Sequence, residues 1–226
     1  MYTKEQFAKT IDNTLLRPTS TREEVLHLCA ESAARHFAAV CILPCWVGAA
    51  ARALSGTDVK VCTVVAFPYG ASTKLSKVYE AKNAVANGAQ EIDAVMNLAR
   101  FKSGDYDAVL EDLRGVADAV RGAARLKVII ETCYLTPGEI DTASQIVQDA
   151  GADFIKTSTG TAGGGATADD IRRIRRAVGA SSIGIKASGG IKAVETALQM
   201  LDAGANRLGT SSGVALYDAY TSQTAI

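Results

Sequence analysis

Histidine is scarce in this chain, and so are several other features that mark large classes of protein. Only two histidines occur among 226 residues, His27 and His36, and both fall in or at the end of one predicted helix. Zinc sites and metal-assisted catalytic sites commonly depend on histidine ligands, so the sequence gives no histidine-built metal site. We therefore expect no metal and no cofactor, and the sequence disfavours metal-dependent enolate chemistry.

The chain also lacks an excess of charge and lacks long apolar runs. It has 24 basic and 24 acidic residues, for a formal net charge of zero. No basic patch predicts nucleic-acid binding, and the arginine-rich run at 172–176 is typical of a solvated helix face. No apolar run reaches the roughly 18 residues of a membrane span, and the first six residues are polar. We expect neither a nucleic-acid nor a membrane partner.

Five cysteines are an odd number that does not suit a disulfide framework. Cys41, Cys62 and Cys133 lie in strand-like runs and Cys29 lies in a helical pattern. Buried reduced thiols are typical of a cytoplasmic protein, which is the predicted location. Cys41 and Cys45 are four residues apart, but no second pair of cysteines or histidines completes a zinc site.

Short apolar runs alternate with amphipathic stretches along the whole chain, without a linker or a low-complexity tract. The predicted strands cover 10–15, 38–43, 60–66, 91–97, 127–131, 154–156, 183–186 and 207–209. The predicted helices between them cover 21–36, 73–87, 106–122, 137–150, 168–178 and 192–203. Such alternation predicts a parallel sheet. Eight strands, with no Gly-x-Gly-x-x-Gly after the first, favour an α/β fold with one (β/α)8 TIM barrel and a short N-terminal helix over residues 1–226.

Three Gly-Ala segments each end a predicted helix and open a strand. They begin at Gly88, Gly151 and Gly204. Glycine ends helices readily because it adopts the left-handed conformation at little cost. Five residues after these glycines come Asp93, Lys156 and Gly209, so all three are predicted near the C-terminal ends of strands. In barrels of this kind, that end carries the catalytic residues.

Side chains alternate along a strand, and the alternation separates charged from apolar positions here. The outer positions are apolar, as helix cover requires. The charged residues predicted to point into the barrel are Glu91, Asp93, Lys127, Glu131, Lys156 and Lys186. Charges inside a barrel must be paired, so the sequence predicts that they mark the functional site.

Lys156 ends a buried strand and is followed by hydroxyl residues and glycine, and Lys186 ends a second strand before two glycines. Burial and a neighbouring like charge both lower the pKa of a lysine ammonium. A neutral lysine amine attacks a carbonyl and forms a Schiff base. We expect Lys156 to be that nucleophile, Lys186 to stay protonated beside it, and Asp93 to move protons.

Glycine-rich and serine-rich segments predict a phosphate site at the same end of the barrel. They contain Gly160, Gly189 and Gly190, Ser211 and Ser212. Backbone N–H groups at helix N-termini bind anions, and TIM barrels often hold phosphate on the loops after strands 7 and 8.

Together these segments resemble the deoxyribose-phosphate aldolases, a family of class I, Schiff-base aldolases. The resemblance covers nearly the whole chain and rests on the motifs at 11–16, 40–44, 65–70, 91–93, 151–160, 186–190 and 209–212. It implies reversible cleavage of 2-deoxy-D-ribose 5-phosphate to acetaldehyde and D-glyceraldehyde 3-phosphate, in deoxyribose phosphate catabolism. It also implies a homodimer that acts on small phosphorylated sugars and aldehydes.

The resemblance implies a role for each site residue. Lys156 corresponds to the Schiff-base lysine, Lys186 to the lysine that lowers its pKa, and Asp93 to the proton-transfer acid. The residues expected to contact substrate or its phosphate are Asp12, Cys41, Thr157, Gly160, Gly189, Gly190, Ser211 and Ser212.

Two positions depart from the family pattern. Asn13 replaces the usual histidine; an asparagine keeps a hydrogen bond but does not titrate, so we expect a structural role there and intact catalysis. The tail at 221–226 lacks the terminal tyrosine that closes the site in some members, which leaves Tyr217 and Tyr220 as candidates.

Two other functions stay open from the sequence. One is a related Schiff-base aldolase that acts on a different phosphorylated aldehyde pair. The other is a phosphate-binding barrel without catalysis, which would need the glycine and serine loops but not the set of Lys156, Lys186 and Asp93.

Overall fold

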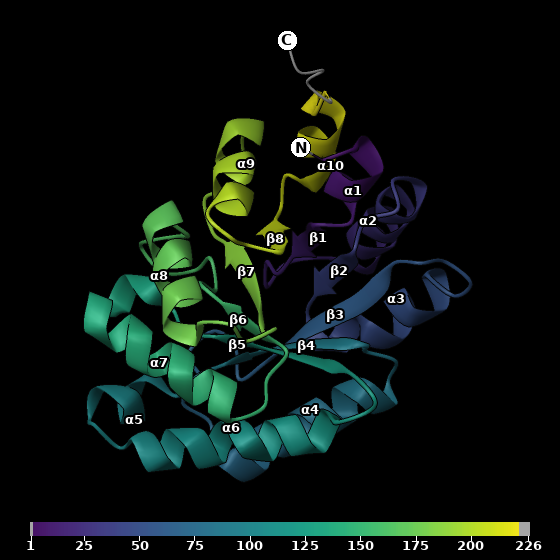
Figure 1. The fold of residues 1–226 in the computed structure, drawn as a ribbon. Helices are drawn as coiled ribbons and strands as arrows, with labels where there is room; N and C mark the ends of the chain where they lie inside the picture. Colours follow the sequence, from purple (N-terminus) through teal and green to yellow (C-terminus); the bar gives the residue numbers. More distant parts are fainter. Residues whose placement is uncertain (1, 222–226) are drawn as a thin grey trace.

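The computed structural model describes residues 2–221, and eight parallel strands in it form one closed barrel (Figure 1). The strands are β1 (Ile11–Leu15), β2 (Ala39–Ile42), β3 (Lys60–Val65), β4 (Glu91–Val95), β5 (Arg125–Ile129), β6 (Phe154–Lys156), β7 (Gly184–Ser188) and β8 (Arg207–Thr210). Their order around the barrel follows the sequence, and β8 pairs with β1 to close it. The predicted TIM barrel is confirmed.

Helices surround the strands. They are α1 (Lys4–Ala8), α2 (Arg22–Ala34), α3 (Val47–Ala53), α4 (Lys74–Ala86), α5 (Leu98–Lys102), α6 (Tyr106–Val120), α7 (Pro137–Asp149), α8 (Ala168–Val178), α9 (Val194–Asp202) and α10 (Gly213–Ala219), with 3-10 turns η1 (Pro44–Trp46) and η2 (Thr132–Tyr134). The short N-terminal helix is present. Helices α3 and α5 were not predicted, because α3 is alanine-rich without an apolar period and α5 has five residues. None of the helices within 2–221 is both long and apolar enough to cross a membrane.

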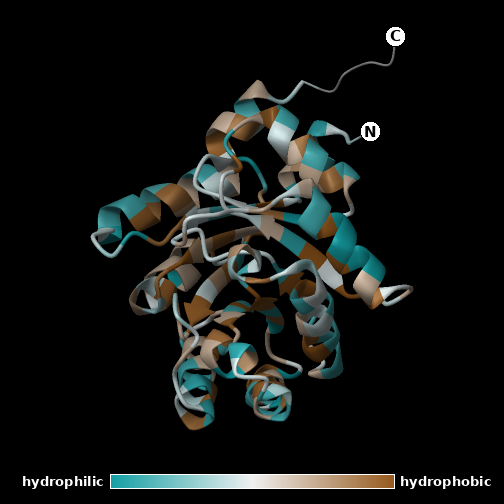
Figure 2. Ribbon diagram, turned by 90° about the vertical axis from the view of Figure 1, so that its left-hand side faces the viewer, coloured by the Kyte–Doolittle hydropathy of each residue, from teal (hydrophilic) through white to brown (hydrophobic). Residues whose placement is uncertain are grey.

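The main apolar core lies between the barrel and its helices, as the alternation predicts. Ile92, Val128, Ile155 and Ile185 are fully buried on the outer side of their strands. Figure 2 shows hydrophobic residues gathered on the strands and on the helix faces turned toward them, with hydrophilic residues on the outside. A much smaller apolar cluster, around Cys41 and Cys62, lies apart from this core. The charged side chains that the strands direct into the barrel are therefore buried apart from the main apolar core.

Strand β5 ends earlier than the sequence suggested. The predicted strand runs to Glu131, whereas β5 ends at Ile129. Glu131 has φ 51° and ψ 67°, in the left-handed region, where a strand cannot continue. The prediction that Glu131 belongs to the strand is therefore wrong, and Glu131 begins the turn that leads into η2.

Helices α1 and α10, the first and last of the described chain, pack together on one side of the barrel (Figure 1). The ring of Tyr220 stacks on Phe7 with 4.2 Å between centroids, and its hydroxyl donates to the carbonyl of Tyr2 at 2.7 Å. Tyr217 packs edge-on against Phe37. Because α1 directly precedes β1, these contacts lie toward the N-terminal end of the strands. Neither tyrosine reaches the opposite end, so neither replaces a closing tyrosine.

At the N-terminal end of the strands, the barrel interior is filled by the ring of Phe154, which requires a glycine at position 184. Phe154 of β6 and Gly184 of β7 are register partners. A Cβ added at Gly184 would lie 2.2 Å from a ring carbon of Phe154. The guanidinium of Arg207 lies 5.9 Å from the centre of the same ring. Gly184 therefore leaves room for the ring that separates the charged interior from the N-terminal end.

Gly184→Ala is expected to lower the free energy of unfolding by about 1–3 kcal/mol, because the Phe154 ring must move within a packed interior. Urea denaturation measures the change. Gly138→Ala is the matched control, since an added Cβ there meets no atom within 4 Å. Equal stability of Gly184→Ala and the wild type would contradict this account.

Candidate active site

Four cations and three carboxylates meet inside the barrel. They are Lys127, Lys156, Lys186 and Arg207, with Asp12, Glu91 and Asp93. They come from strands β1, β4, β5, β6, β7 and β8, and all are buried. If every group is ionised, the cluster carries one net positive charge. Such a cluster is stable only when each charge is paired, and the contacts show how the pairing is made.

Asp93 is the centre of this cluster. Its Oδ2 accepts from the ammonium of Lys156 at 2.8 Å and from that of Lys186 at 2.7 Å. Its Oδ1 accepts from Lys127 at 2.8 Å. Strand register creates this arrangement, because Asp93 lies opposite Lys127 across β4 and β5, and Lys156 lies opposite Lys186 across β6 and β7. One carboxylate thus bridges three ammonium groups.

Asp12 and Glu91 complete the pairing below Asp93. Asp12 Oδ2 lies 2.5 Å from the ammonium of Lys186, and Arg207 donates through Nε to Asp12 Oδ1 at 2.8 Å. Glu91 Oε2 lies 2.6 Å from Lys127 and 2.8 Å from Arg207. These other cations each contact at least two carboxylates. Among residues 2–221, the ammonium of Lys156 forms an ion pair with Asp93 alone.

The charges hold one another ionised. Burial by itself would raise the pKa of Asp93, but Lys127, Lys156 and Lys186 outweigh burial and hold that pKa well below its ordinary value. Asp12 behaves in the same way next to Arg207 and Lys186. Burial would lower the pKa of Lys186, yet Asp12 and Asp93 outweigh it and raise that pKa. Lys186 therefore keeps its proton at neutral pH.

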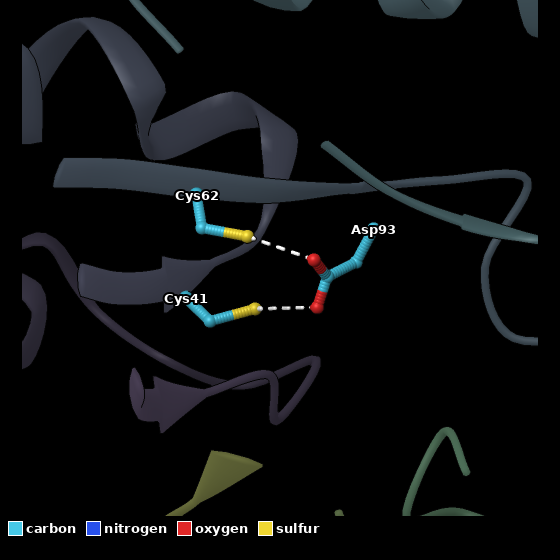
Figure 3. A group of neighbouring side chains, drawn as sticks. All are labelled: Cys41, Cys62 and Asp93. Atoms are coloured by element: carbon cyan, nitrogen blue, oxygen red, sulfur yellow. Dashed lines mark hydrogen bonds between the residues drawn. The ribbon is translucent and has the colours of Figure 1, made fainter. Parts of the chain in front are cut away.

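Two thiols also point toward Asp93 (Figure 3). Cys62 donates to Oδ1 at 3.1 Å and Cys41 approaches Oδ2 at 3.8 Å, from register partners on β2 and β3. Burial and the neighbouring Cys41 and Asp93 raise the pKa of Cys62 well above its ordinary value. The sulfur and carboxylate atoms are close enough to ligate a metal. A divalent cation there would face the ammonium groups that already occupy Asp93, so this set does not suit a metal.

A cavity of about 560 Å³ lies above the charged cluster, at the C-terminal ends of the strands. It is lined by Lys156 and by residues from the loops after β1, β6, β7 and β8, including Arg17, Thr159, Gly160, Thr161, Gly189, Gly190, Lys192 and Ser211. Lys156 is thus the member of the charged cluster that reaches the cavity. Asp93, Lys186, Asp12 and Cys41 lie beneath it.

Four residues expected at the substrate do not line this cavity: Asp12 and Cys41, which lie beneath it, and Thr157 and Ser212. The Thr157 hydroxyl donates to the carbonyl of Ser188 at 3.2 Å and accepts from the Ser188 N–H at 3.1 Å, so it ties β6 to β7. Ser212 directs its N–H to the Thr210 hydroxyl at 2.9 Å. Thr157 follows Lys156 and Ser212 follows Ser211, and both of these neighbours line the cavity. The sequence does not show which residue of such an adjacent pair faces the cavity.

Arg17 and Lys192 are cavity-lining cations that the sequence did not single out. Both occur in loops directly after strand ends, which is the signal that would have found them. Asn13 instead faces away from the site: its amide donates to the Ser32 hydroxyl at 3.1 Å, and its oxygen lies against Gly213. This position joins β1 to α2 and α10.

The loops around the cavity offer unused backbone donors. In the described chain, the N–H groups of Gly160, Gly189, Gly190 and Ser211 make no hydrogen bond to another residue. Gly189 also packs closely, because a Cβ added at the facing Gly165 would lie 2.3 Å from the carbonyl oxygen of Gly189. Unused N–H groups on residues that line one cavity, together with Arg17 and Lys192 in the same lining, form an arrangement that suits an anion.

Comparison with known proteins gives a consistent result. A family model described as DeoC/LacD family aldolase matches residues 7–219. A deoxyribose-phosphate aldolase from Geobacillus sp. (strain WCH70) is 48% identical over 221 residues, 98% of this chain and 99% of the relative. One from Thermoanaerobacter sp. (strain X514) is 51% identical over 213 residues, 93% and 95% of the two chains. The solved tetrameric deoxyribose phosphate aldolase from Aeropyrum pernix superposes with a TM-score of 0.90 at 31% identity, covering 98% and 94%.

Asp12→Asn is expected to lower the free energy of unfolding by about 3–5 kcal/mol, because it leaves buried Lys186 and Arg207 short of a counter-charge. A depressed folded-state pKa contributes stability that is present above the unfolded pKa, about 3.9, and is lost as pH falls through the folded pKa. Urea denaturation from pH 7 to pH 2 should therefore show a steeper loss in the wild type than in Asp12→Asn.

Asp118→Asn is the control, since it removes an exposed carboxylate paired with Arg121 and should change stability by less than about 0.5 kcal/mol. If Asp12→Asn matched this control in stability and in pH dependence, the charged cluster would not contribute to folding as described.

Proposed function

Because the chain belongs to the DeoC/LacD family of aldolases, we propose that it cleaves 2-deoxy-D-ribose 5-phosphate reversibly, through a Schiff base on Lys156. The products are acetaldehyde and D-glyceraldehyde 3-phosphate, in deoxyribose phosphate catabolism. The observation that carries the proposal is the position of Lys156, which lines the cavity and has Asp93 as its carboxylate partner at 2.8 Å. The names of relatives at about half identity support the substrate.

The ion pairs of the cluster single out Lys156 as the nucleophile. The interior cluster has four cations and three carboxylates, so loss of one proton makes it neutral. Lys127, Lys186 and Arg207 each contact at least two carboxylates, which favours their charged forms. Lys156 has one carboxylate partner, so freeing its amine for attack breaks the fewest ion pairs. It is also the lysine of the cluster that lines the cavity.

The chemistry begins when Nζ of Lys156 attacks the aldehyde carbon of the open-chain sugar and forms a carbinolamine. Loss of water gives an iminium, which accepts the electron pair of the C2–C3 bond as that bond breaks. The C3 hydroxyl loses its proton and becomes the carbonyl of D-glyceraldehyde 3-phosphate. Protonation of the remaining enamine and addition of water release acetaldehyde and the free amine.

Asp93 supports these steps by its position between two lysines. Its Oδ2 lies within hydrogen-bond distance of both Lys156 and Lys186. A proton can therefore pass between the reacting nitrogen and the Lys186 ammonium across one carboxylate oxygen. Asp12 and Asp93 hold the pKa of Lys186 above its ordinary value, so this lysine returns to its protonated form between the steps. No metal or cofactor enters this sequence, since the amine itself supplies the electrophilic iminium.

The substrate phosphate is assigned to the N–H groups of Gly160, Gly189, Gly190 and Ser211. The cations Arg17 and Lys192 line the same cavity and offer counter-charge. Thr157 and Ser212 do not contact the phosphate in this proposal. Their hydrogen bonds to Ser188 and Thr210 position the loops that do. The cavity thus has an amine below and anion donors around it, which matches a sugar with an aldehyde at one end and a phosphate at the other.

We also propose that residues 1–226 form a single catalytic domain and that the protein acts in the cytoplasm. All five cysteines are free, and Cys29, Cys41 and Cys62 are buried, which supports a reducing compartment.

Incubation with 2-deoxy-D-ribose 5-phosphate followed by borohydride is expected to leave a reduced acetaldehyde adduct on Lys156, because borohydride reduces the iminium to a stable amine. Peptide mass spectrometry locates the adduct. Lys156→Ala should lose both the adduct and turnover, whereas the exposed Lys82→Ala should keep both.

An adduct on Lys186 alone would reverse the roles of the two lysines. Turnover without any adduct would overturn the Schiff-base mechanism. Binding of the sugar phosphate without turnover would favour the non-catalytic barrel, and turnover of a different sugar phosphate alone would favour the related aldolase.

We propose a homodimer, supported by a group of exposed apolar side chains. Tyr69, Leu75 and Tyr79, in the loop after β3 and on α4, are 81%, 80% and 74% exposed. Light scattering should give twice the mass of the chain, and Leu75→Asp should shift it toward the monomer, because a charge is costly to bury in such a contact. Arg172→Asp on α8 is the control. A wild-type monomer, or a tetramer as described for the Aeropyrum pernix protein, would contradict the dimer.

A further inference from the structure

We propose that Glu131 is a positioning residue that shapes the phosphate end of the cavity and so sets the preference for a phosphorylated substrate. The inference rests on the proposed function. It assigns a role to a buried carboxylate that the Schiff-base chemistry does not use. Glu131 does not line the cavity, so it must act through a neighbour.

The carboxylate of Glu131 is in an unusual environment. Glu131 is 2% exposed, and among residues 2–221 no lysine, arginine or histidine lies within ion-pair distance of it. Its backbone has φ 51°, which is unfavourable for a residue with a side chain. Burial without a cation and a strained backbone both oppose folding, and such costs persist at sites where the geometry serves function.

Hydrogen bonds from one residue satisfy this carboxylate. The Thr159 N–H donates to Oε1 at 3.1 Å and the Thr159 hydroxyl donates to Oε2 at 2.5 Å. The same hydroxyl accepts from the Thr161 N–H at 3.1 Å. The carboxylate therefore fixes the hydroxyl of Thr159 as a donor, which leaves its oxygen to accept from Thr161.

This chain of bonds closes the loop around Gly160. Thr159, Gly160 and Thr161 all line the cavity. The Thr159 N–H donates to Glu131 and the Thr161 N–H donates to the Thr159 hydroxyl, whereas that of Gly160 donates to no other described residue. Glu131 thus decides which backbone donor of this loop stays available to an anion. Because the loop begins three residues after Lys156, the same bonds also set the distance between the anion end and the amine.

A carboxylate serves this purpose in a way that an amide does not. A carboxylate only accepts hydrogen bonds, so both Thr159 donors must point toward it. A glutamine of the same shape carries an NH₂ group that can donate to the Thr159 hydroxyl and displace the Thr161 N–H. The neighbouring segment fixes the loop independently, since the Thr132 N–H donates to the Thr157 carbonyl at 2.9 Å. Glu131→Gln should therefore alter the loop locally while the barrel stays folded.

The test compares 2-deoxy-D-ribose 5-phosphate with unphosphorylated 2-deoxy-D-ribose as substrates of the full chain. For Glu131→Gln we expect KM for the phosphorylated sugar to rise about 10-fold, as for loss of one hydrogen bond to a charged group, with kcat for the unphosphorylated sugar unchanged. Inhibition of 2-deoxy-D-ribose cleavage by inorganic phosphate should weaken by a similar factor. Thr159→Val removes the hydroxyl that donates to Glu131 and should raise KM for the phosphorylated sugar in the same way. Thr159→Ser keeps a hydroxyl and should leave KM near the wild-type value.

Equal losses on both sugars would overturn the inference, since they would indicate a role in folding or in the chemistry itself. Unchanged kinetics in Glu131→Gln and Thr159→Val would also overturn it. If Glu131→Gln does not fold, the same kinetic comparison between Thr159→Val and Thr159→Ser tests the inference. Failure of the proposed function is distinct, because the wild type would then not cleave the phosphorylated sugar at all.

Discussion

One carboxylate that accepts hydrogen bonds from three ammonium groups organises the interior of this protein. The carboxylate of Asp93 forms ion pairs with Lys127, Lys156 and Lys186. Without it the three lysines could not share a buried space, because each would lose its hydration and repel the others. The pairing of Asp12 and Glu91 with Arg207 then extends the alternation of charge down to the ring of Phe154. Reactivity and stability therefore depend on the same contacts.

Most of the fold could be predicted from the sequence, because strands and helices alternate regularly and apolar residues alternate with inward positions along the strands. Outward apolar positions and helix-ending glycines located the eight strands, and the alternation put Asp93, Lys156 and Lys186 on one face. Strand ends were less certain. Glu131 was predicted to continue β5, since the sequence pattern does not reveal that its backbone turns into the left-handed region.

The pairing of charges was harder to predict than their direction. Arg207 opens β8 and bonds Asp12 on β1 and Glu91 on β4, which lie 195 and 116 positions away in the sequence. Only closure of the barrel brings them together. Asp12 was expected at the site through family resemblance, whereas Arg207 carried no signal of its own. Thr157 and Ser212 show the converse limit. Both belong to the expected loops, yet the Thr157 hydroxyl and the Ser212 N–H bond to neighbouring residues and neither residue lines the cavity.

The register between β6 and β7 has a consequence for how such a protein can change. Lys156 and Lys186 face each other because their strands pair at those positions, and a shift of one residue would turn one lysine toward the helices. The lysine pair therefore belongs to the barrel, while the anion donors and flanking cations belong to loops. The two parts are separable: loop length and composition can vary with the shape of the substrate, while the hydrogen-bonded ladder keeps the reactive amine unchanged.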